Sequence, residues 1–105
     1  YKVTFLNGYP PTKNDKDMVD SFLASAHKIL PKENIHISTE ESMGGEDAGF
    51  FYQKVPGCFF RLYSSAPFAD GEVYPAHSSR FVLDDSVLYR GTALFLQNIF
   101  DHLTI

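Results

Sequence analysis

The sequence predicts an α/β fold, with a partial layer of a mostly parallel sheet and flanking helices. Two observations favour this class. Short apolar runs of strand type alternate along the chain with stretches of helical periodicity, an order typical of parallel strands joined by helices. The 105 residues are 44% hydrophobic and include ten phenylalanines, enough for the core of one domain.

The N-terminal third contains three predicted elements. Residues 1–6 alternate along the chain in the manner of a strand with one wetter face. Residues 15–30 predict a helix, because apolar side chains recur at spacings of one, three and four. Asn14 is the expected N-cap, and Pro31 is expected to end the helix. Residues 35–37 predict a second, short strand.

Two further elements are predicted in the middle of the chain. Glu46 and Asp47 place negative charge at the start of a short helix, expected to run to about Lys54. Residues 58–64, "CFFRLYS", predict a buried strand. Cys58 is the only cysteine, so no internal disulfide is possible. We expect a buried structural thiol and a reducing, cytoplasmic compartment.

The C-terminal part begins with a loop of about 16 residues, 64–79, and loops of that length are often functional. Residues 80–83 predict a short strand or an extended entry into the next element. Residues 86–103 predict a final helix, capped by Asp84, Asp85 or Ser86. Its expected buried apolar stripe consists of Leu88, Leu94, Phe95, Ile99 and Leu103. Three or four strands would make a thin sheet. An aromatic content of 15% is high for so small a sheet unless other layers cover it, which indicates an incomplete domain.

Charge and hydropathy argue against two classes of partner. The formal net charge is -4, and the nine basic residues are scattered, so no nucleic-acid surface is expected. No apolar run approaches the roughly 18 residues of a membrane span. The first residue is Tyr1 and not Met, so we expect a chain processed or cut from a longer protein.

His77 is the most conspicuous candidate site residue. The stretch "VYPAHSSRF" places it in a polar loop, whereas the other three histidines fall in predicted helices or a strand. Two interpretations remain open: a solvated loop histidine, or a metal ligand or catalytic acid/base. One histidine is not a metal site, and no HxxH, HxH or CxxC pattern accompanies it. Glu46 and Asp47 are the other carboxylates of interest, with helix N-terminal charge as the simpler explanation.

Three stretches together resemble the C-terminal part of the catalytic domain of the zinc-dependent amidohydrolases. They are "GYPPTKND", "SMGGEDAGFFYQKVPGCFF" and "YPAHSSRFVLDDSVLYRGTAL". The family includes N-acyl-amino-acid amidohydrolase (aminoacylase), hippurate hydrolase and the indole-acetyl-amino-acid hydrolases, and counts as a metallopeptidase family. The stretches follow the order and about the spacing of that family and cover nearly the whole chain.

The resemblance implies a division of the chain and a set of site residues. Residues 1–8 would be the closing strand of a lid domain, and residues 9–105 the C-terminal portion of a zinc-peptidase-like catalytic domain. The family binds two metal ions, zinc or manganese, and His77 matches a histidine ligand in its Pro-Leu-His-Ser-Pro loop. The run Gly44, Gly45, Glu46 and Asp47 matches a Gly-Gly-Glu-Asp turn near the cleft, which implies a supporting or substrate-contacting role.

The sequence also departs from the family pattern. Ala76 and Ser79 replace a leucine and a proline around the histidine, Tyr89 replaces a proline, and "PFADGEV" has no evident counterpart. The upstream ligand and general-base motifs of the family are absent, so no catalytic residue is expected within this chain.

The resemblance therefore implies the C-terminal fragment of a metal-dependent amidohydrolase or peptidase, inactive alone. The intact enzyme would hydrolyse the amide bond of N-acyl amino acids or small peptides. Its partners would be that substrate and the missing N-terminal half, and the isolated chain is expected to self-associate and to bind no metal tightly. The alternative is a stand-alone, non-catalytic binding or interaction domain that retains the fold.

Overall fold

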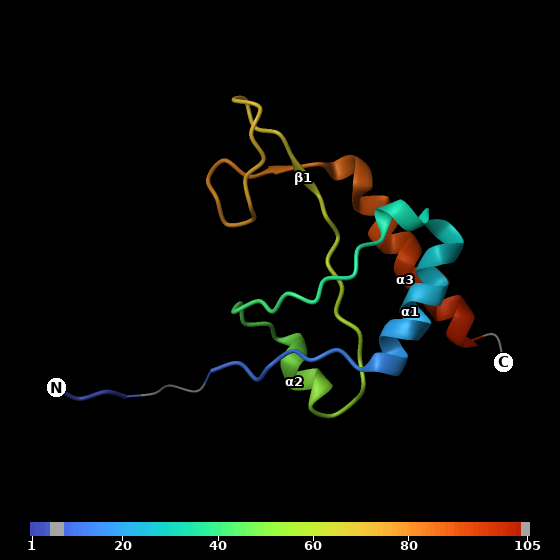
Figure 1. Cartoon of the computed structure of the whole chain (residues 1–105), viewed down its shortest axis with the longest axis horizontal. Coiled ribbons are helices and arrows are strands. Elements are labelled where there is room, and N and C mark those ends of the chain that lie inside the picture. Colours follow the sequence, from blue (N-terminus) through green and yellow to red (C-terminus); the bar gives the residue numbers. More distant parts are fainter. Residues whose placement is uncertain (5–7, 104–105) are drawn as a thin grey trace. The chain divides into compact units, whose positions relative to one another are not determined.

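The computed structural model describes residues 1–4 and 8–103, and the chain forms two compact units, residues 1–59 and 60–105. The first unit contains helix α1 (Lys16–Ile29), the short 3-10 helix η1 (Lys32–Asn34) and helix α2 (Ala48–Tyr52). In Figure 1, η1 follows α1 closely, and a long extended segment leads from η1 to α2. Among the described residues, no helix combines the length and the apolar character needed to cross a membrane.

Helix α1 confirms the helix predicted from apolar periodicity, but its cap lies one residue further on than expected. Asp15, not Asn14, is the N-cap. The Asp15 carboxylate accepts hydrogen bonds from the backbone N–H groups of Asp17 at 3.0 Å and Met18 at 3.1 Å. Both amides lack partners inside the helix, so a carboxylate at this position satisfies them and also suits the positive helix end.

Asn14 has a different role, because its amide group binds backbone 45 residues away. Its Nδ2 donates to the carbonyl oxygen of Phe59 at 2.9 Å, and the Phe59 N–H donates to Asn14 Oδ1 at 2.7 Å. The Asp15 N–H donates to the carbonyl oxygen of Gly57 at 2.9 Å. These three bonds attach the start of α1 to the segment 57–59.

Helix α2 begins after Asp47, which caps it without a side-chain hydrogen bond. The short helix predicted from residue 46 is therefore present, in a shorter form. Its Gly49 is buried, and an added Cβ there would lie only 2.6 Å from the Pro10 carbonyl oxygen. The backbone of residues 10–12 thus lies directly against α2, at a distance that only glycine permits.

The second unit contains strands β1 (Ser65–Ala66) and β2 (Val82–Leu83), the 3-10 helix η2 (Asp85–Val87) and helix α3 (Leu88–Leu103). The two strands pair antiparallel, with Ser65 opposite Leu83. In Figure 1 the chain leaves β1, makes a long loop and returns through β2 to η2 and α3. Asp84 caps η2, because its Oδ1 accepts the Ser86 N–H at 3.0 Å.

The extended segment 60–62 packs along α3 within the second unit. The rings of Phe60 and Phe95 lie 5.4 Å apart, and a Leu62 methyl group lies 3.3 Å from the place of a Cβ on Gly91. Leu94 is the one residue of α3 that is buried.

The fold class is therefore confirmed only in its coarser form, as a mixture of helices and strands. The described residues contain one two-stranded antiparallel sheet, and no parallel sheet. Residues 35–37 and 58–64 are not strands, whereas the strand predicted at 80–83 is present as β2. Residues 1–4 form no strand, and the rest of the strand predicted over 1–6, residues 5 and 6, lies outside the described residues.

The predicted stripe of buried residues along the last helix is exposed at most of its positions. Leu94 is buried, but the other four predicted residues are exposed: Leu88, Phe95, Ile99 and Leu103. Apolar periodicity shows which face of a helix avoids water, and strand-like patterns show which segments extend. Neither pattern supplies the neighbouring segment that would cover the face or pair with the strand.

We predict that Asn14→Ala lowers the free energy of unfolding by about 1–2 kcal/mol, because it removes both bonds to Phe59 and each such bond contributes about 1 kcal/mol. Urea unfolding followed by circular dichroism measures the change. Asn34→Ala, at an exposed position in η1, is the control and should stay within about 0.5 kcal/mol of wild type. Equal effects of the two substitutions would contradict the role assigned to Asn14.

We also predict that Gly49→Ala is destabilising, although alanine is favoured over glycine in a helix by about 1 kcal/mol. The new Cβ would overlap the Pro10 carbonyl, and backbone displacement in a packed site costs about 1–3 kcal/mol. Gly8→Ala is the control, since an added Cβ there meets nothing within 4 Å. A thermal unfolding series in which Gly49→Ala melts at or above wild type would refute the close contact.

Candidate functional site

The loop between β1 and β2 contains two consecutive turns, residues 75–78 and 78–81, and His77 lies in the first of them. The Ser78 N–H donates to the Pro75 carbonyl oxygen at 3.2 Å, and the Phe81 N–H donates to the Ser78 carbonyl oxygen at 3.1 Å. His77 has φ 72°, the one positive φ among the described non-glycine residues. A positive φ at the third position of a turn is what a type II turn requires, and histidine adopts it more readily than most residues.

The His77 side chain is exposed, so its ring is accessible to a ligand. The described residues contain no group of three or more His, Cys, Asp or Glu side chains arranged to hold a metal ion. A metal centre therefore does not fit within this part of the chain alone. The chemistry of His77 does fit a single position in such a centre, because a neutral imidazole nitrogen is a common zinc donor.

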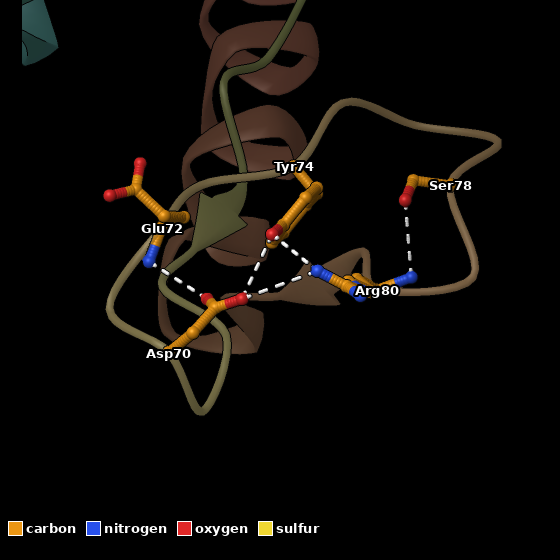
Figure 2. Close-up of polar contacts among 5 residues, drawn as sticks. All are labelled: Asp70, Glu72, Tyr74, Ser78 and Arg80. Carbon is orange, nitrogen blue, oxygen red and sulfur yellow. Dashed lines mark hydrogen bonds and ion pairs between the residues drawn. The ribbon is translucent and has the colours of Figure 1, made fainter.

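Figure 2 shows a polar network formed by the side chains of Asp70, Tyr74 and Arg80. The Tyr74 hydroxyl donates to Asp70 Oδ2 at 2.8 Å, and Arg80 Nη1 donates to the Tyr74 hydroxyl oxygen at 2.8 Å. Arg80 Nη1 also lies 3.5 Å from Asp70 Oδ2. The three side chains thus contact one another in a triangle. Asp70 and Tyr74 precede His77 in the sequence, and Arg80 follows it.

The segment between Pro67 and Val73 holds Asp70 in place. Pro67 and Val73 form an antiparallel bridge, and the Phe68 N–H donates to the Glu72 carbonyl oxygen at 2.8 Å. Asp70 Oδ1 accepts the Glu72 N–H at 3.0 Å, so one carboxylate oxygen is used by the turn and the other faces Tyr74. This is the "PFADGEV" stretch that the family resemblance leaves unaligned.

The run of Gly44, Gly45, Glu46 and Asp47 lies in the first unit, just before α2, and its four residues are exposed. An added Cβ on Gly45 would lie 2.6 Å from the Tyr9 ring, so this glycine allows a close approach of that side chain. The carbonyl oxygens of Glu46 and Asp47 accept the N–H groups of Gly49 and Phe50. A structural role in starting α2 is thus visible, and a role toward substrate stays a prediction.

Cys58 and Tyr52 are the two groups of the first unit whose pKa values rise on burial. Desolvation raises the pKa of the half-buried Cys58 thiol, which favours the unreactive protonated form. Burial also raises the pKa of the Tyr52 hydroxyl, with a smaller contribution from Cys58. The structural interpretation of Cys58 agrees with these shifts, although the thiol is only partly buried.

The other three histidines lie outside this loop. His27 and His36 are exposed. The His102 ring lies in the last turn of α3, where its Nδ1 is 2.8 Å from the Asn98 carbonyl oxygen, one turn earlier in the helix. An imidazole at this position stabilises the negative helix end.

Sequence reasoning missed Asp70, Tyr74 and Arg80. The Asp70-Gly71 pair was an available turn signal, and Gly71 indeed has φ 85°. The side-chain triangle itself could not be predicted from the sequence. Separate backbone turns, at residues 68–71, 75–78 and 78–81, bring the three residues together.

The profile of the peptidase family M20/M25/M40 matches residues 1–101 of the chain. The chain is 37% identical over 83 residues to thermostable carboxypeptidase 1 of Saccharolobus solfataricus, an overlap of 79% of this chain and 20% of that protein. It is 28% identical over 88 residues to the putative amidohydrolase YhaA of Bacillus subtilis, covering 84% and 22%.

A plant relative shows the same pattern: IAA-amino acid hydrolase ILR1-like 4 of Arabidopsis thaliana is 30% identical over 86 residues, covering 82% of this chain and 19% of the relative. No solved structure matches the chain. The chain spans about one fifth of the length of these relatives. The resemblance inferred from the three sequence stretches is confirmed: the chain belongs to the peptidase family M20/M25/M40.

Proposed function

We propose that this chain is the C-terminal portion of a metal-dependent amidohydrolase or peptidase, and that His77 is its contribution to the metal site. The observation that carries the proposal is that the exposed His77 has φ 72°. Its turn is flanked in sequence by Tyr74 and Arg80, whose side chains are hydrogen-bonded to each other. A non-glycine residue at positive φ costs about 1–2 kcal/mol, so the surrounding structure must enforce it. Such enforced strain is common at functional sites.

The remaining donors would come from residues outside this chain. Three observations support this: the absence of a three-donor group among the described residues, the family membership, and an overlap of only about a fifth of each relative's length. A bound divalent cation would supply Lewis-acid chemistry toward an amide carbonyl. His77 would hold one coordination position and present a neutral ring nitrogen there.

The proposed substrates are N-acyl amino acids or small peptides. The names of the relatives support this class: one is a carboxypeptidase, one a putative amidohydrolase and one a hydrolase of IAA-amino acids. In this proposal the run 44–47 lies near the substrate, residues 1–8 close the lid domain, and residues 9–105 belong to the catalytic domain. The metal would be zinc or manganese.

We predict that His77→Asn in the full-length enzyme lowers turnover of N-acetyl amino acids by roughly 100- to 1000-fold, as expected for loss of one strong electrostatic contribution. Asparagine is chosen because it also tolerates positive φ, whereas alanine would strain the turn. Metal content, measured by elemental analysis after dialysis, should fall with turnover.

His36→Asn is the matched control, since His36 is exposed and lies outside the loop. It should leave both quantities near wild type. If His77→Asn retained full metal occupancy and near-normal turnover, the ligand assignment would be wrong. Micromolar zinc binding by the 105-residue chain alone would instead favour the stand-alone binding domain.

We further propose that the α3 apolar surface is covered by the rest of the enzyme. This surface consists of the exposed apolar residues Leu88, Tyr89, Phe95, Leu96, Ile99, Phe100 and Leu103. Contiguous apolar area on a monomer rarely exceeds a few hundred Å². We therefore predict that the isolated chain self-associates, with a sedimentation coefficient that rises over a micromolar concentration series.

The double variant Ile99→Lys and Leu103→Lys places two charges one turn apart on this surface and should reduce association. Lysine is tolerated near a helix C-terminus, so the helix itself should persist. Val55→Lys, an exposed apolar position outside α3, is the control and should associate like wild type. A wild-type chain that sediments as a monomer at every concentration would contradict the proposal.

A further inference from the structure

We propose that Asp70, Tyr74 and Arg80 are positioning residues that preset the turn carrying His77 for metal binding. The three residues are called the clamp below. The proposal rests on the proposed function of His77, and it assigns a role to the "PFADGEV" stretch, which supplies Asp70. None of the three side chains is itself proposed as a metal ligand.

The sequence positions of the clamp set its effect on the backbone. Tyr74 precedes His77 by three residues and Arg80 follows it by three. The 2.8 Å bond from Arg80 Nη1 to the Tyr74 hydroxyl oxygen therefore joins the two sides of the turn. A link across so short a segment restricts the conformations open to Pro75, His77 and Ser78, which lie between its ends.

The Tyr74 ring is held on two further sides. Phe68 meets it edge-on, with ring centroids 6.0 Å apart and an interplanar angle of 90°. The Arg80 guanidinium carbon lies 5.3 Å from the Tyr74 ring centroid, within cation–π range. Tyr74 is also the clamp residue that is half-buried, whereas Asp70 and Arg80 are exposed.

The hydroxyl of Tyr74, and not the ion pair, is the central element of the clamp. The Asp70 and Arg80 side chains are 40% and 56% exposed and 3.5 Å apart, and exposed ion pairs contribute little to stability. The hydroxyl donates to the carboxylate and accepts from the guanidinium, both at 2.8 Å, and bonds to charged groups are the stronger kind. Removing that one oxygen therefore breaks both 2.8 Å bonds, while the Tyr74 ring and the 3.5 Å contact between Asp70 and Arg80 remain.

A matched control exists elsewhere in the same unit. Tyr89 and Arg90 form a comparable pair, with Arg90 Nε 3.5 Å from the Tyr89 hydroxyl and the guanidinium carbon 5.9 Å from the ring centroid. Tyr89 lies in α3 and not in the loop. Tyr74→Phe and Tyr89→Phe thus make the same chemical change, and only the first touches the turn of His77.

The first measurement is amide hydrogen exchange by NMR on the 105-residue chain. Loss of the clamp should increase exchange at Ser78 and Phe81, whose N–H groups close the two turns, by about fivefold in Tyr74→Phe. Asp70→Asn keeps an acceptor for the Glu72 N–H but loses the charge, and should act in the same direction. Tyr89→Phe should leave both amides unchanged.

The second measurement is the zinc dissociation constant of the metal-free full-length enzyme. Changes in groups that orient a ligand typically weaken metal binding 10- to 100-fold, and we expect about tenfold for Tyr74→Phe and no change for Tyr89→Phe. The His77→Asn variant is titrated in parallel, so that the ligand assignment is tested separately from the clamp.

Faster turn exchange and weaker zinc binding in Tyr74→Phe, with neither in Tyr89→Phe, support the clamp. Exchange in Tyr74→Phe no faster than in Tyr89→Phe overturns it, whatever the metal result. Unchanged zinc affinity in Tyr74→Phe, together with a large loss in His77→Asn, overturns the clamp and leaves the proposed function intact. Unchanged affinity in His77→Asn overturns the proposed function and, with it, the role of the clamp in metal binding.

Discussion

The antiparallel pairing of β1 with β2 is the contact on which the candidate site depends. It brings Ser65 opposite Leu83, and the Asp84 N–H extends it by donating to the Ser64 carbonyl oxygen at 2.7 Å. The chain between the strands must therefore return to its starting point. Turns at Gly71 and His77 make that return possible, and each has a positive φ. The accessible position of His77 follows from this closure.

The two units bury little apolar surface on their own. Ala26 and Leu94 are the buried hydrophobic residues among those described, while many large apolar side chains are exposed. A chain of this size would usually bury enough apolar surface to be stable alone. The exposure of these side chains agrees with a chain that covers only about a fifth of the length of its relatives. In the proposed enzyme, the remaining four fifths supply both the cover and the other metal donors.

The sequence predicted elements whose cause is local and failed where the cause is distant. Helix α1 follows from apolar spacing and an acidic cap, although the cap is Asp15 and not Asn14. The stretch 58–64 is apolar like a strand, yet strand formation needs a partner, and the described residues provide none. His77 was a candidate because of its place in a polar loop, and the family resemblance added the proposed role of metal ligand. The clamp was not predicted, because the positions of Asp70, Tyr74 and Arg80 reflect turn geometry and not a motif.

The central claim is that the loop of this unit presents His77 to a metal ion held mainly by residues outside the chain. A crystal structure of the zinc-loaded full-length enzyme, with anomalous data at the zinc edge, tests this most directly. We expect a His77 ring nitrogen about 2.0–2.1 Å from a zinc peak, with His77 keeping its positive φ. Zinc fully ligated by other residues, with the His77 ring directed to solvent, would contradict it.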